Sequence, residues 1–183
     1  MGQQMTNHSH RAAFLADSPK QKSRGPPQPC EYKVIALREC PSSESLRLCD
    51  TPDKAAEYWR AHVKAHPYFT PEQECFVVLL LTARRKTKGH VLVSIGTLDE
   101  IHIHPREVFR AAIIAGAAAI VLMHNHPSGD PHPSEADIKT TRDMIRAGQL
   151  LKIDVLDHVI MGQRLPEHER GYASLRELGF FYT

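Results

Sequence analysis

The stretch from His124 to Asp137 constrains the fold of this chain more than any other part of the sequence. His124 and His126 are two residues apart, so on a β-strand both imidazoles project from the same face while Asn125 points the other way. Three prolines and one glycine within positions 127–133 predict a tight, non-helical turn. A helix that opens at Ser134 then brings Asp137 back toward the histidines in its first turn. The sequence therefore predicts a strand, a sharp turn and a helix N-terminus that meet at one point.

The three side chains that meet there are suited to holding a metal ion. Two imidazoles and one carboxylate leave the fourth position of a tetrahedral zinc site open to water, which distinguishes catalytic zinc sites from structural ones. Ser134 and Asp137 also have the spacing of a helix capping box. The two roles are compatible, because a carboxylate at a helix N-terminus is kept ionised, as a metal ligand must be. We expect His124, His126 and Asp137 to bind Zn²⁺.

The other histidines near this pattern are not expected to bind the metal. His102 and His104 repeat the two-residue spacing, but no serine and aspartate follow them at the corresponding distance. Pro105 instead predicts the start of a helix, with proline at its first position. His132 lies between two prolines of the turn, where we expect it to face solvent.

Length and composition favour one ordinary domain. The 183 residues are 42% hydrophobic, enough for one conventional core. No segment approaches the ~18 apolar residues of a membrane span, and the first thirty residues have no apolar signal region. The cysteines form no C-x-x-C pair, which argues against a zinc ribbon and favours reduced thiols; they are Cys30, Cys40, Cys49 and Cys75. These features predict a cytoplasmic protein with no membrane partner.

The formal net charge is only +2, and part of it is concentrated near the start of the sequence. Residues 1–30 are rich in Gln, Ser and Pro, lack hydrophobic periodicity and are predicted to form a disordered leader. A nearly neutral remainder does not have the broad basic face expected of a dedicated DNA-binding protein. DNA is therefore a weakly supported partner, and the sequence does not predict the oligomeric state.

Residues 31–67 are predicted to form an N-terminal strand and helix that pack on the core. Partial apolar alternation indicates the strand over residues 31–38. Thr51 and Pro52 are typical of a helix start, and the apolar face of that helix consists of Ala56, Trp59 and Val63.

The main domain is predicted over residues 68–183, where strands and helices alternate. The apolar run from Phe76 to Leu81 predicts a buried central strand, which a basic turn joins to a second strand in a hairpin. The remaining elements are a helix over 105–116, a strand over 117–123, a helix over 134–151 with Ile138, Thr141 and Ile145 on one face, and a strand over 155–161. This order predicts an α/β fold with a mixed sheet flanked by helices.

Several segments between Tyr68 and Gly179 resemble a known family, the RadC-like members of the JAB/MPN group, which carry a JAMM metal motif. These segments are Gly96-Thr97-Leu98, the stretch from His104 to Arg110, the stretch from His124 to Asp137, and Leu156-Asp157-His158-Val159-Ile160. The resemblance implies a cytidine-deaminase-like α/β fold around one zinc ion, with His124, His126 and Asp137 at the ligand positions. Asp157 and His158 are adjacent on a predicted strand, so at most one of them points toward the metal.

The resemblance also implies two catalytic residues. The family has a serine that supports the tetrahedral intermediate, and Ser134 matches it. It also has an upstream glutamate that acts as general acid and base near a central strand. Glu74 is our choice because it stands two residues before Phe76, and Glu72 is the alternative. RadC proteins usually have an N-terminal helix-hairpin-helix region that contacts DNA, and we expect none here because no glycine-rich hairpin of that type precedes Glu31.

These features together predict a zinc-dependent metallohydrolase, specifically a metallopeptidase or isopeptidase with a peptide or isopeptide substrate. The alternative is a DNA-repair-associated accessory protein whose metal site is structural or vestigial. A base deaminase is excluded, because deaminases of this fold use H-x-E followed by P-C-x-x-C and no such cysteine pair occurs.

Overall fold

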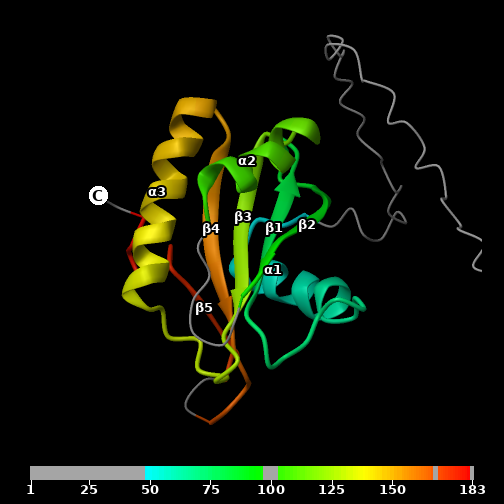
Figure 1. Ribbon diagram of the computed structural model, residues 1–183, viewed down its shortest axis with the longest axis vertical. Helices are drawn as coiled ribbons and strands as arrows, with labels where there is room; N and C mark the ends of the chain where they lie inside the picture. Colours follow the sequence, from blue (N-terminus) through cyan, green and yellow to red (C-terminus); the bar gives the residue numbers. More distant parts are fainter. Residues whose placement is uncertain (1–47, 97–102, 167–168, 182–183) are drawn as a thin grey trace, which may run out of the picture. The chain divides into compact units, whose positions relative to one another are not determined.

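In the part of the chain that the structure describes, five strands form one mixed sheet in the order β2-β1-β3-β4-β5 (Figure 1). They are β1 (Cys75–Leu81), β2 (Thr87–Ile95), β3 (Ala119–Asn125), β4 (Asp154–Met161) and β5 (Tyr172–Ser174). Only β3 and β4 are parallel neighbours; the other pairs are antiparallel. The α/β fold with a mixed sheet flanked by helices is therefore confirmed.

This computed structural model describes residues 48–96, 103–166 and 169–181. The leader predicted over 1–30 and the strand predicted over 31–38 lie outside the described residues, as do Cys30 and Cys40. No helix among the described residues is long and apolar enough to cross a membrane. Cys49 and Cys75 are buried free thiols, and burial raises the pKa of each to about 11.

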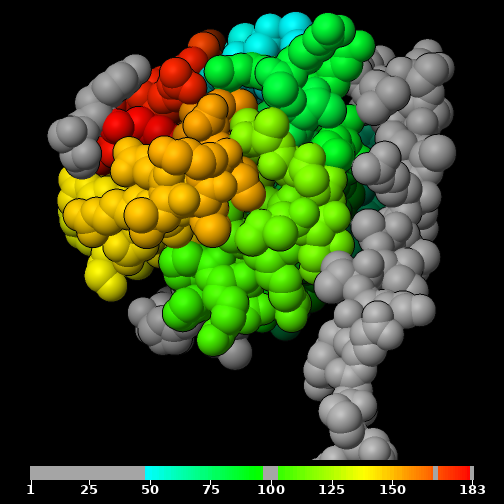
Figure 2. Space-filling view, turned by 90° about the horizontal axis from the view of Figure 1, so that it is seen from above, coloured from blue at the N-terminus to red at the C-terminus, as the bar shows by residue number. Residues whose placement is uncertain are grey.

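The sheet is covered on both faces, which explains the unbroken apolar run of β1. One face of β1 packs against α1 (Pro52–Tyr58) and the π-helical turn η2 (Trp59–Val63) that continues it. The other face packs against α2 (Pro105–Ile114) and α3 (Glu135–Leu151). Figure 2 shows the end of the domain where the last turn of α3 lies beside α2.

The helix predicted after Thr51 forms as expected. Thr51 caps it, Pro52 occupies its first turn, and its predicted apolar face, Ala56, Trp59 and Val63, is buried. This helix lies before the segments that resemble the family, and it supplies a large part of the core on its side of the sheet.

Three details differ from the sequence prediction. β2 begins at Thr87, because Arg85 adopts a left-handed conformation (φ 59°) and completes the turn earlier than the basic run suggested. On α3, Met144 is fully buried, whereas Ile145, which was predicted on the buried face, is only partly buried. The buried residues of α3 are spaced by three, three and four positions: Ile138, Thr141, Met144 and Gly148. The three-residue strand β5 carries too little periodicity to be predicted.

Candidate metal centre

The predicted strand, turn and helix N-terminus meet at the carboxyl end of β3 (Figure 1). His124 is the last but one residue of β3, where it pairs with Phe76 in β1 and Ile160 in β4. Because β1 is antiparallel to β3, the residues just before β1 lie at the same end of the sheet as the carboxyl end of β3. Two segments far apart in the sequence, before residue 75 and after residue 123, therefore face each other.

The turn after β3 is held against β4 by backbone hydrogen bonds. The amide of His126 donates to Met161 O (3.0 Å), and the amide of Gln163 donates to Gly129 O (2.8 Å). Gly129 has φ +84°, a conformation that favours glycine, and its amide donates back to His126 O (3.0 Å). This bonding fixes the direction in which the chain leaves His126.

Ser134 caps α3 and forms the predicted capping box with Asp137. The Asp137 amide donates to Ser134 Oγ (3.2 Å), while the Ser134 amide donates to Asp137 Oδ2 (2.8 Å). These two hydrogen bonds hold Asp137 in the first turn of α3, with its carboxylate toward the end of β3.

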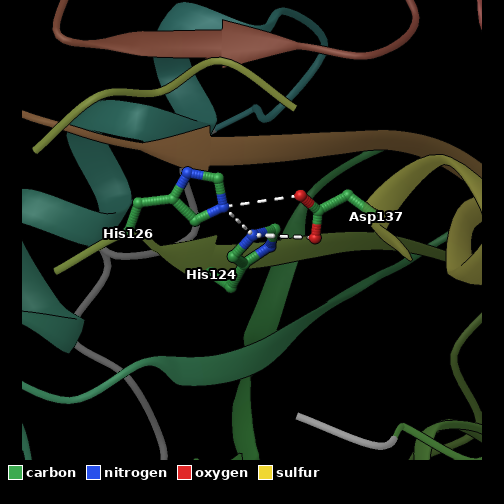
Figure 3. A group of neighbouring side chains, drawn as sticks. All are labelled: His124, His126 and Asp137. Atoms are coloured by element: carbon green, nitrogen blue, oxygen red, sulfur yellow. Dashed lines mark hydrogen bonds and ion pairs between the residues drawn. The ribbon is translucent and has the colours of Figure 1, made fainter. Parts of the chain in front are cut away.

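The three predicted ligands converge (Figure 3). His124 Nε2 lies 3.0 Å from His126 Nε2 and 3.2 Å from Asp137 Oδ1, and His126 Nε2 lies 3.4 Å from Asp137 Oδ2. Ligand atoms of a tetrahedral zinc site with bonds of ~2.0–2.1 Å are ~3.3 Å apart. The donor atoms thus have types and spacing suited to holding a metal ion. Among the described residues, this is the one group of histidine, cysteine and acidic side chains that could hold a metal ion.

The hydrogen bond on the far side of His126 determines which nitrogen faces the cluster. His126 Nδ1 lies 2.8 Å from the carbonyl oxygen of Asp130. A carbonyl only accepts, so Nδ1 carries a proton, and Nε2 is the nitrogen that faces His124 and Asp137. This is the tautomer in which a histidine binds metal through Nε2.

A buried relay fixes His124 in the same way. Thr141 Oγ1 donates its only proton to Asp137 O (2.7 Å) and so accepts from His158 Nδ1 (2.6 Å). His158 Nε2 is then an acceptor for the proton on His124 Nδ1 (2.8 Å). Burial, followed by the nearby His124, lowers the pKa of His158 well below its usual value, which keeps the ring neutral as this relay requires.

The Nε2 atoms of both rings and the Asp137 carboxylate therefore point toward one another, while the Nδ1 atoms bond groups outside the cluster. Burial alone would raise the pKa of Asp137, but hydrogen bonding with His124 and His126 and then with Ser134 outweighs it and holds the pKa far below the usual range. Burial likewise acts to lower the pKa of His126, while Asp137 and the Asp130 carbonyl raise it by a larger amount. Both pKa shifts show that positive charge is favoured at this cluster, and a bound metal cation would supply it.

Glu74 and Glu72, the two alternatives for the upstream glutamate, occupy different surroundings. Glu74 Oε1 is 3.7 Å from His124 Nε2, and its side chain is 20% exposed. Burial is the main cause that raises the pKa of Glu74, and the charge of Asp137 adds to it. Glu72 is exposed. The structure thus brings Glu74 to the edge of the cluster.

The histidines set aside in the sequence analysis have other roles. His104 caps α2, with Nδ1 accepting from the Arg106 amide (3.1 Å). His132 is exposed and uses its amide to bond Asp130 Oδ1 (2.9 Å). His102 lies outside the described residues.

His158 and Thr141 are the two contributors that the sequence did not assign. Asp157 and His158 are adjacent in a segment that resembles the family, and we expected at most one of them to point toward the metal. The two side chains do face opposite sides of β4. Asp157 bonds Ser174 Oγ (2.7 Å) and backbone amides away from the cluster, while His158 bonds His124. The sequence signal for His158 was its place in a segment that resembles the family. Its contact with His124 depends on the register between β3 and β4, which the sequence does not show.

Comparison with known proteins agrees with this fold. A family model described as RadC-like JAB domain matches residues 49–180. A UPF0758 protein of Methanosarcina barkeri is 44% identical over 109 residues, which cover 60% of this chain and 45% of that protein. A UPF0758 protein of Staphylococcus haemolyticus is 50% identical over 109 residues, with the same coverage.

A third UPF0758 protein, from Caldanaerobacter subterraneus, is 46% identical over 109 residues, or 60% of this chain and 44% of that protein. The chain thus spans less than half the length of these curated relatives, and their names state no activity. The family match extends from before α1 to beyond β5 and includes every residue of the candidate metal centre. This chain belongs to the RadC-like JAB domain family.

Proposed function

We propose that this domain is a zinc-dependent hydrolase that cleaves amide or isopeptide bonds. The proposal is supported by the convergence of His124 Nε2, His126 Nε2 and the Asp137 carboxylate, with the Nδ1 atom of each ring bonded away from the cluster. Three such ligands leave one position for water, as in catalytic zinc sites.

The donor set favours zinc among the common protein metals, because imidazole nitrogen with one carboxylate suits it well. Bound zinc supplies Lewis-acid chemistry: it lowers the pKa of water toward ~7 and polarises a substrate carbonyl. The remaining chemistry falls to the side chains around it.

Glu74 is proposed as the general base and acid. Its carboxylate lies next to His124 Nε2, so it can accept a proton from an attacking water and later deliver that proton to the leaving amine. The raised pKa of Glu74, caused first by burial, suits this double role because proton transfer is efficient when the pKa lies nearer the working pH.

Ser134 is proposed to stabilise the oxyanion that forms during amide hydrolysis. Its hydroxyl donates to Asp137 Oδ2 (2.6 Å), and the Ser134 amide donates to the same oxygen. The hydroxyl can therefore turn toward a substrate oxygen while the amide keeps Asp137 in place. A donor of this kind contributes roughly 3 kcal/mol to transition-state stabilisation in favourable cases.

The experiment compares Glu74→Gln with the matched variant Glu72→Gln. Zinc content is measured beside hydrolysis of a peptide and isopeptide library, with and without chelator. We expect Glu74→Gln to keep its zinc and lose about 10²–10⁴-fold in turnover, while Glu72→Gln matches the unmodified protein. A fully active Glu74→Gln protein would reject the assigned base, and the reverse pattern would assign Glu72.

The library also tests the activity itself. If the zinc-loaded protein cleaves no member and instead binds DNA with an affinity that falls steeply with salt, the hydrolase proposal fails and the accessory role stands.

A further inference from the structure

A cleft of ≈ 470 Å³ lies directly beside the candidate metal centre. His126 and Pro127 form one wall, η2 and the residues after it form another, and the segment from Met161 to Arg164 forms a third. His126 contributes to both places: Nε2 belongs to the ligand cluster and the residue lines the cleft. A molecule in the cleft would therefore lie against one of the ligands.

Three basic side chains line this cleft: Arg60, Lys64 and Arg164. No aspartate or glutamate is among the described residues that line it, and none of the three cations is in an ion pair with another described residue. The cleft thus gathers positive charge that the described part of the chain leaves without a paired anion in its lining.

Arg60 and Arg164 carry like charges and line the same cleft. Burial is the largest cause that lowers the pKa of the Arg60 guanidinium, and the charge of Arg164 is the next. Asp53 and Glu57 act on Arg60 in the opposite direction, but with smaller effect. Like charges held together in this way favour a bound anion, because the anion relieves their repulsion.

The wall that carries Arg164 is tightly packed. A Cβ on Gly162 would lie 2.4 Å from Gly129 O, so this segment is in close contact with the turn after His126. A Cβ on Gly171 would lie 2.7 Å from Cγ of Arg164, so the Arg164 stem rests on that glycine. Arg60 is also held, since its guanidinium donates to Arg170 O (2.7 Å). The Arg60 guanidinium and the stem of Arg164 are therefore held in place before a ligand binds.

We propose that this cleft binds an acidic side chain of the peptide substrate, close to the amide bond that is cut. The inference rests on the proposed hydrolase function and adds the class of substrate to it. Phe69 and Pro127, which are both partly exposed, give the cleft an apolar surface for the hydrocarbon part of a glutamate, and the three cations bind its carboxylate.

A peptide fits these walls better than a nucleic acid does. Single-stranded nucleic acids bind on exposed aromatic rings along a groove of positive charge. Here Trp59 is buried, and Phe69 packs edge-on against it with ring centroids 5.9 Å apart, so Trp59 offers no face for a base. The three cations surround a single cleft.

The test measures binding separately from cleavage. Fluorescent peptides that differ only in Glu or Gln at two positions are titrated with the zinc-loaded full chain carrying Glu74→Gln, so that the peptide stays intact. Lys64→Gln and Arg164→Gln are added to this protein singly and together. Arg142→Gln, which removes an exposed cation on α3, is the matched control.

We expect the Glu peptide to bind at least about 10-fold more tightly than the Gln peptide. Each of Lys64→Gln and Arg164→Gln should reduce this preference by about 3–10-fold, and Arg142→Gln should leave it within about 2-fold. Equal affinity for the two peptides, or a preference that survives the double variant, overturns the proposal. A single-stranded oligonucleotide that binds more tightly than the Glu peptide and depends on the same two cations also overturns it.

Cleavage by the chain with Glu74 intact then separates the two proposals. A charge preference in binding without cleavage of any peptide supports the proposed binding of an acidic side chain in the basic cleft and rejects the hydrolase. Cleavage with no preference between Glu and Gln peptides rejects the cleft and supports the hydrolase.

Discussion

His158 Nε2 lies 2.8 Å from His124 Nδ1, and both imidazoles are completely buried. The contact joins neighbouring parallel strands, β4 and β3, at the edge where the metal ligands converge. Because Thr141 supplies an acceptor to the other side of His158, the protons of both rings are directed away from the cluster. His158 and Thr141 are therefore positioning residues, and they act through His124.

Thr141→Val should weaken zinc binding. The substitution keeps the shape of the side chain but removes the acceptor for the His158 N–H, so the tautomer of His124 is no longer fixed. We expect zinc affinity to fall by about 10–100-fold, as for other losses of a group that orients a metal-binding histidine. Competition with a chelating dye measures it. Thr140→Val on the same helix is the control, and equal affinities in the two variants would refute the relay.

Asn125→Ala should destabilise the protein and impair catalysis. Asn125 Oδ1 accepts from the Cys75 amide (3.0 Å) and its Nδ2 donates to Gln73 O (3.0 Å), so this side chain holds the backbone on both sides of Glu74. The variant leaves a buried amide without an acceptor, at a cost of about 2 kcal/mol in unfolding free energy. Turnover should fall as well, since Glu74 is less well placed.

Urea unfolding of the zinc-free protein and peptide hydrolysis measure the two effects. Gln73→Ala is the control, because only the backbone of Gln73 bonds Asn125. If Asn125→Ala is as stable and active as Gln73→Ala, the bracing role is wrong.

Local patterns in the sequence predicted the elements of the site, and the contacts between elements needed the structure. The spacing of His124, Asn125 and His126 predicted which side chains share a face, and the structure shows Asn125 on the opposite side. The capping box between Ser134 and Asp137 is a local feature and was predicted too. Glu74 and His158 reach His124 only through strand pairing across 50 and 34 residues, which no local pattern specifies.

Packing details escaped prediction for the same reason. Ile145 and Met144 are neighbours on α3, and hydrophobicity alone does not decide which is buried. The basic residues that line the cleft are far apart in the sequence: Arg60 lies in η2, Lys64 follows η2, and Arg164 follows β4. No local pattern in the sequence predicts that they share one cleft.

Gly162→Ala should disturb the turn that carries His126. The added Cβ would lie 2.4 Å from Gly129 O and 2.8 Å from Pro131 Cδ, so backbone must move to admit it. We expect about 2–3 kcal/mol of lost unfolding free energy, as for overpacking elsewhere, together with weaker zinc binding. Urea unfolding and dye competition test both, and an unchanged unfolding midpoint would show that the contact is easily relaxed.

His90 should make the domain less stable in acid. Its nitrogens each bond a tyrosine hydroxyl, Tyr58 and Tyr68, at 2.9 Å. Burial, followed by the charges of His66 and His62, lowers the pKa of His90 from 6.5 to about 4. Because the unfolded chain binds this proton more readily, the stability from neutral His90 is complete above pH 6.5 and is lost as the pH falls toward 4.

Unfolding of the zinc-free protein in urea at pH 7 and pH 5 isolates this effect when His90→Gln is measured in parallel. Allowing for partial exposure of the ring, the unmodified protein should lose about 1 kcal/mol more than the variant over this interval. The same loss in both proteins would place the acid sensitivity elsewhere.

Zinc content is the most direct test of the central claim that His124, His126 and Asp137 form a metal site. The purified protein is stripped with chelator, reloaded with zinc, desalted and analysed by mass spectrometry of the metal. We predict about one zinc per chain in the unmodified protein, in Glu74→Gln and in the control His132→Ala, and almost none in His126→Ala or Asp137→Ala. An unmodified protein that retains no more zinc than Asp137→Ala would contradict the account.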